Sequence, residues 1–123
     1  MACTIDIKDY VPQHVPVLVG RKNGETLVEK LAAKGITWNA LEATEDTIEI
    51  IVPERIETMN GSYFLGAWGN RVRALGGAAA FFAKYHFHAS PHIVDAIHLH
   101  AERAMVMGSQ VDILLAKGEG KDG

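Results

Sequence analysis

The segment from Thr47 to Pro53, TIEIIVP, limits the possible folds of this chain more than any other. It is rich in β-branched residues and nearly continuous in apolar character, a pattern typical of an interior strand covered on both faces. Proline cannot donate to a strand ladder, so Pro53 is expected to end the strand. A strand of this kind predicts a sheet covered by helices.

The rest of the chain alternates between strand and helix patterns. Strands are predicted at 3–10, 47–53, 84–90 and 110–116, and helices at 25–35, 62–75 and 91–107. Two prolines and two glycines in 11–24 indicate an irregular loop. The alternation favours an α/β sandwich with crossover helices. Functional loops of such folds gather at the carboxyl ends of strands, and 53–62 is such a loop.

Length and composition predict a single domain that can bury a sizeable core. The domain is expected over 1–116, followed by a flexible tail at 117–123. A net charge of −3 argues against a nucleic-acid partner, which would require a basic face. One cysteine, no signal-peptide pattern and no apolar run of about 20 residues predict a cytoplasmic protein that does not contact a membrane.

Several blocks of the chain together resemble a known family. They are the central stretch IEIIVPERIETMNGSYFLGAWGNRVRALGG, the stretches FFAKYHFHAS and IVDAIHLHAERAM, and upstream the pairs Gly20-Arg21 and Gly24-Glu25. Their order and spacing resemble the STAS-like domain family of unknown function. That family is related to the STAS domains of anti-sigma-factor antagonists and sulphate transporters. The resemblance runs from Gly20 to Met105.

The resemblance implies a small mixed sheet of about four strands with helices packed mainly on one face. It also implies a non-enzymatic regulatory module that binds another protein, such as a kinase or an ATPase regulator. In the related regulators, a serine at the start of the helix after the central strand is phosphorylated by a partner kinase. Ser62 occupies the matching place here. Those regulators carry Asp directly before the serine, whereas this chain carries Gly61.

The turn Asn60-Gly61-Ser62 has other interpretations. As a glycosylation acceptor it would require a secretory context, which the cytoplasmic prediction excludes. A hydrolase elbow, Gly-x-Ser-x-Gly, would require glycine at positions 60 and 64, where the chain has Asn60 and Phe64. No catalytic residue is therefore predicted. Ser62 is expected to cap the following helix, and Thr58, Asn60, Gly61 and Ser62 are predicted to form the interaction site and a phosphorylation point.

Histidines suggest a second hypothesis, from a different class of protein. His86 and His88 lie at i and i+2 on a predicted strand, so both rings can point the same way and chelate one cation. A small metal-binding protein or a metal-dependent enzyme would use this pair. His98 and His100 lie on opposite sides of a predicted helix and cannot share an ion. Without a stronger ligand motif, no cofactor is predicted.

A third hypothesis concerns anions. Gly20, Arg21 and Gly24 precede or open a predicted helix, where a phosphate group can bind. A nucleotide-binding module of STAS type would use Arg21 together with the 54–62 loop. The apolar run at 78–82 is also predicted to form an exposed edge, which a homodimer would cover.

Overall fold

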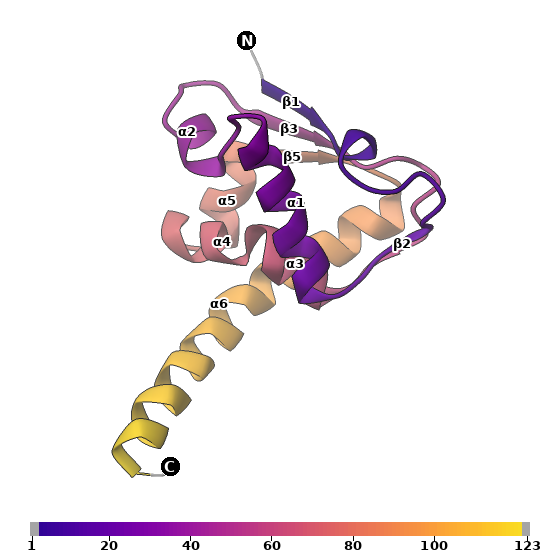
Figure 1. The fold of residues 1–123 in the computed structure, drawn as a ribbon. Helices are drawn as coiled ribbons and strands as arrows, with labels where there is room; N and C mark the ends of the chain where they lie inside the picture. The colour runs from indigo at the N-terminus through magenta and orange to yellow at the C-terminus, as the bar shows by residue number, and fades with distance from the viewer. Residues whose placement is uncertain (1–2, 122–123) are drawn as a thin grey trace.

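In the computed structural model, residues 3–121 are described, with their side chains as far as Val106. The chain forms an α/β fold whose elements follow one another as shown in Figure 1. The strands are β1 (Cys3–Asp6), β2 (Val17–Leu18), β3 (Ile48–Ile51), β4 (Thr58–Met59) and β5 (Tyr85–His88). The helices are η1 (Ile7–Asp9), α1 (Arg21–Ala33), α2 (Trp38–Glu42), α3 (Gly61–Phe64), the π-helical η2 (Leu65–Gly69), α4 (Asn70–Leu75), α5 (Ala78–Lys84) and α6 (Pro91–Lys121).

The strands form two small sheets. In the larger sheet β3 lies between β1 and β5, and the smaller sheet pairs β2 with β4. Every pairing among the described strands is parallel, so the expected mixed sheet is wrong in its strand directions. Helical connections explain this result, because a chain that returns through a helix places successive strands in the same direction.

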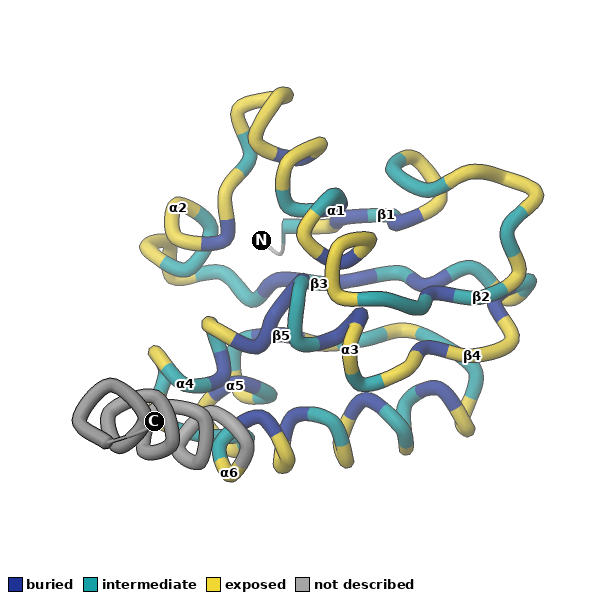
Figure 2. The backbone as a smooth tube through the Cα atoms, turned by 60° about the horizontal axis from the view of Figure 1, so that its bottom comes forward, coloured by how far each residue is buried: buried dark blue, intermediate teal, exposed yellow. Residues whose placement is uncertain are grey.

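One face of the larger sheet carries the core. Ile5, Ile48, Ile50 and Tyr85 are buried on that face, and helices pack on them. The alternate residues of the same strands are exposed or half-buried, as the teal and yellow segments of Figure 2 show. The strand at 47–53 is therefore central, as predicted, but the residues on its second face, Glu49 and Ile51, are only half-buried.

Helix α1 crosses the helix formed by α3, η2 and α4 at very short range. A Cβ built on Gly24 would lie 2.2 Å from the Tyr63 carbonyl oxygen, and one built on Gly66 would lie 2.2 Å from the Arg21 carbonyl oxygen. Both distances are shorter than real contacts, so only glycine lets the two backbones approach this closely. Glycine within a helix is unfavourable on its own, and close packing against α1 explains its use here.

The C-terminal part of the chain differs from the sequence prediction. The strand expected at 110–116 does not form, because α6 continues to Lys121. Of the expected tail, residues 117–121 belong to this helix and residues 122–123 lie outside the described residues.

The apolar run at 78–82 begins α5 and is less exposed than predicted. Phe81 is fully buried, and Phe82 is half-buried under the stacked ring of His98, 4.0 Å between ring centroids. Only Ala79 and Ala80 of this run are exposed. A homodimer through this edge stays a prediction.

Candidate functional site

The segment before the Asn60-Gly61-Ser62 turn is held at several points. Strand β4 pairs with β2, and two histidines of α6 bond to the backbone of Glu57 and Met59. His92 Nε2 donates to the Glu57 carbonyl oxygen and His100 Nε2 to the Met59 carbonyl oxygen, both at 2.9 Å. The Arg55 guanidinium donates to the carbonyl oxygen of Val15 on the neighbouring loop. The 54–62 loop is therefore fixed in place by side chains distant in sequence.

Asn60, not Ser62, caps the helix that follows. Its side-chain oxygen accepts a hydrogen bond from the Tyr63 backbone N–H at 2.9 Å, the usual N-cap geometry. The same oxygen accepts a bond from the Gly20 N–H at 3.3 Å, which ties this turn to the start of α1. The prediction that Ser62 is the cap is wrong, because the helix begins at Gly61 and its cap lies two positions before Ser62.

Ser62 is exposed, and among the described residues its hydroxyl has no hydrogen-bond partner. A hollow of about 220 Å³ lies beside it, lined by Gly61, Ser62, Leu65, His100 and Arg103. The last two residues come from α6, about 40 positions further along the chain. Sequence reasoning missed both, since no local spacing relates them to the serine. Thr58, the remaining residue of the predicted site, is exposed on β4.

The predicted anion-binding residues have separate environments. The Gly20 N–H is already bonded to Asn60, and Gly24 faces the backbone of the crossing helix. Arg21 forms an ion pair with Glu25 at 3.5 Å, in which both side chains are more than half exposed. Its affinity for an anion stays a prediction.

A larger cleft of about 640 Å³ separates α1, α2 and η2. Its walls include Arg21, Glu25, Val28, Trp38, Leu65, Gly66 and Arg71, and none of residues 54–62. The third hypothesis placed a nucleotide between Arg21 and that loop, and this cleft does not join the two. Leu65 lines both this cleft and the hollow beside Ser62.

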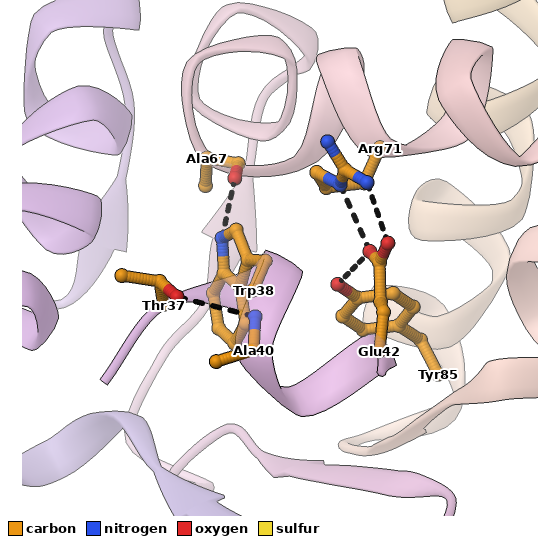
Figure 3. Close-up of polar contacts among 7 residues, drawn as sticks. All are labelled: Thr37, Trp38, Ala40, Glu42, Ala67, Arg71 and Tyr85. Carbon is orange, nitrogen blue, oxygen red and sulfur yellow. Dashed lines mark hydrogen bonds and ion pairs between the residues drawn. The ribbon is translucent and has the colours of Figure 1, made fainter. Parts of the chain in front are cut away.

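One wall of the cleft is held by a charged group that the sequence did not indicate (Figure 3). Arg71 donates two hydrogen bonds to the Glu42 carboxylate, at 2.9 and 2.5 Å, and the Tyr85 hydroxyl donates to the same carboxylate. Burial alone would raise the pKa of Glu42, but the bonds from Arg71 and Tyr85 outweigh it and lower the pKa. The Trp38 indole also donates to the Ala67 carbonyl oxygen of the π-helical turn at 2.9 Å.

His86 and His88 point to the same side of the sheet, as their spacing predicts. Both approach Glu49 on the neighbouring strand, with His86 Nδ1 3.0 Å and His88 Nε2 2.6 Å from its carboxylate oxygens. The hydrogen bond from the Thr47 hydroxyl, followed by that from His88, lowers the pKa of Glu49. Across residues 3–106, no group of three or more His, Cys, Asp or Glu side chains is arranged to hold a metal ion.

No described helix is both long and apolar enough to cross a lipid bilayer. Comparison of the chain with family models, with curated proteins and with solved structures finds no match.

Proposed function

We propose that this chain is a non-enzymatic regulatory module of STAS-like type that works by binding another protein. Its binding face is the 54–62 loop together with the start of α3, and the binding is switched at Ser62. The partner class is a protein kinase or an ATPase regulator. The family resemblance of the sequence suggests this role, and the geometry around Ser62 supports it.

The observation that carries the proposal is the free hydroxyl of Ser62. Since Asn60 caps the helix, Ser62 is not needed for that role and its side chain is exposed to solvent. The loop before it is fixed by His92, His100 and Arg55. A surface that is ordered before binding loses less conformational entropy when a partner docks.

Phosphorylation would change this surface in a defined way. The γ-phosphoryl group of a nucleoside triphosphate is transferred to the Ser62 Oγ, the hydroxyl proton leaves, and a nucleoside diphosphate is released. The new group carries a charge of about −1.5 to −2 at neutral pH. A change of this size at an exposed turn is sufficient to alter the affinity of a docked partner.

The test uses cell extract from the source organism. Purified protein is incubated with extract and radiolabelled ATP, and the labelled residue is mapped by mass spectrometry. We expect label on Ser62 and none in Ser62→Ala. Proteins captured from the extract by wild type are then compared with those captured by Ser62→Glu and by Ala32→Glu, which adds the same charge at an exposed position of α1.

The proposal requires that Ser62→Glu changes the captured set while Ala32→Glu does not. Equal capture by all three proteins, with no label on Ser62, contradicts it.

A further inference from the structure

The hollow beside Ser62 has an unbalanced charge. Of the described residues that line it, His100 and Arg103 are basic and none is acidic. They lie three residues apart on α6, on the same side of the helix. The other residues facing the hollow, Gly61 and Leu65, offer no side-chain charge. The exposed serine hydroxyl therefore borders a small space that, among the described side chains, is lined by basic and not by acidic groups.

His100 is fixed with one nitrogen directed toward the turn. Its Nε2 donates to the Met59 carbonyl oxygen at 2.9 Å, which fixes the position of the ring. Its Nδ1 lies 3.4 Å from the position that a Cβ on Gly61 would take. Because Nε2 keeps its hydrogen for Met59, Nδ1 is the atom that gains a proton when the ring becomes charged. The charged ring then presents an N–H toward the turn.

The Arg103 side chain has no structural role among the described residues. Its side chain is exposed, and it makes no hydrogen bond or ion pair there. A guanidinium carries five N–H donors in a planar fork that matches phosphate oxygens. The fold therefore brings to one hollow an arginine and a serine hydroxyl that have no partner among the described residues.

We propose that a phosphate group on Ser62 is bound within the molecule by Arg103 and His100 of α6. This inference rests on the proposed function, which supplies the phosphorylation of Ser62. It adds which side chains bind the phosphate group once it is there. Phosphorylation would link the start of α3 to α6 and at the same time neutralise the basic hollow. A partner would meet an occupied, neutral surface instead of an open, basic one.

The experiment installs phosphoserine at position 62 during translation, so that it requires neither a kinase nor a partner. The second pKa of the phosphate is measured by ³¹P NMR titration; its ordinary value is about 6. In the otherwise wild-type chain we expect a pKa lower by about one unit, because adjacent cationic groups favour the dianion. In Arg103→Gln the pKa of the phosphate should rise most of the way back to its ordinary value. Lys34→Gln, which removes a cation just beyond the other end of α1, should leave it unchanged.

Thermal unfolding gives a second measurement. Phosphoserine at 62 should raise the Tm of the wild-type chain and should raise it less in Arg103→Gln. His100→Gln keeps a donor for Met59 but cannot become charged, and should return part of the pKa shift. A phosphate pKa that is the same in wild type and in Arg103→Gln would overturn the inference. An unchanged phosphate pKa would say nothing about whether a kinase labels Ser62. A failure to label Ser62 in extract would likewise say nothing about how an installed phosphate group is bound.

Discussion

At the scale of single residues, Asn60 is the position on which the turn depends. Its one side-chain oxygen accepts from Tyr63 and from Gly20, so it caps one helix and links that cap to the start of another. The hydroxyl of Ser62, two positions later, makes no hydrogen bond among the described residues. The bonds that hold the turn and the proposed phosphorylation point therefore belong to different side chains.

Substitution separates the two roles. Asn60→Ala should lower the free energy of unfolding by about 1–2 kcal/mol, because a cap is lost and the Gly20 N–H loses its partner. Ser62→Ala should change it by less than about 0.5 kcal/mol, as is usual for exposed positions. Urea unfolding followed by circular dichroism measures both. A larger loss in Ser62→Ala than in Asn60→Ala would contradict the assignment of the cap.

The sequence predicted the position of this turn but not its chemistry. The strand before it and the helix after it follow from hydrophobic periodicity, which is a local signal. To choose Asn60 over Ser62 as the cap, one must know which residue is the first of the helix. Sequence patterns leave helix boundaries uncertain by one or two positions. His100 and Arg103 could not be assigned to the site at all, since tertiary packing alone brings α6 to the turn.

At the scale of elements, α1 crosses η2 with backbone close against backbone. Glycine is unfavourable within a helix, so Gly66 needs a packing reason. Gly66 packs against the backbone of α1, where Gly24 makes the matching approach. The pairing of these two glycines is a long-range property, which no local sequence pattern predicts.

The two helical glycines Gly66 and Gly69 should respond differently to alanine. Gly66→Ala places a methyl group on the Arg21 carbonyl, so the helices must separate and the free energy of unfolding should fall by about 1–3 kcal/mol or more. Gly69→Ala meets side-chain atoms and no backbone: Leu65 Cδ2 at 3.1 Å, Leu65 Cβ at 3.5 Å and Arg73 Nη1 at 3.7 Å. It should therefore be nearly neutral. Tm values from calorimetry compare the two. Equal losses would show that the crossing is not the reason for glycine at position 66.

At the scale of the whole molecule, the Glu42–Arg71–Tyr85 group joins three separate parts of the chain. It connects α2, α4 and β5 across one wall of the large cleft. The group could not be predicted, because its members lie up to 43 positions apart and no pattern relates them. Its depressed carboxylate pKa makes the stability of the fold depend on pH.

The direction of that dependence follows from the sign of the shift. Since the pKa of Glu42 is lower in the folded than in the unfolded state, its contribution is complete above the unfolded value of about 4.5. This contribution to stability is lost as the pH falls through the pKa of Glu42 in the folded state. Arg71→Met should therefore destabilise the protein by about 1.5–3 kcal/mol at pH 7, because a largely buried carboxylate loses its cationic partner and keeps only the bond from Tyr85. The difference in the free energy of unfolding between Arg71→Met and wild type should be smaller at pH 3.

Arg21→Met is the matched control, because it removes an exposed pair. Its effect on the free energy of unfolding should stay within about 0.5 kcal/mol at both pH values. Denaturant unfolding at pH 7 and pH 3 measures all three proteins. A loss in Arg71→Met that is independent of pH would contradict the assignment of the acid-sensitive contribution to Glu42.

Leu65 forms part of the walls of both cavities, the hollow beside Ser62 and the cleft beside α1. It opens the π-helical turn that crosses α1 with backbone against backbone. At such a contact no flexible side chain is available to absorb a displacement, so neighbouring atoms must move together. The two cavities therefore share one wall. A molecule that binds in one cavity and moves Leu65 changes the volume of the other cavity.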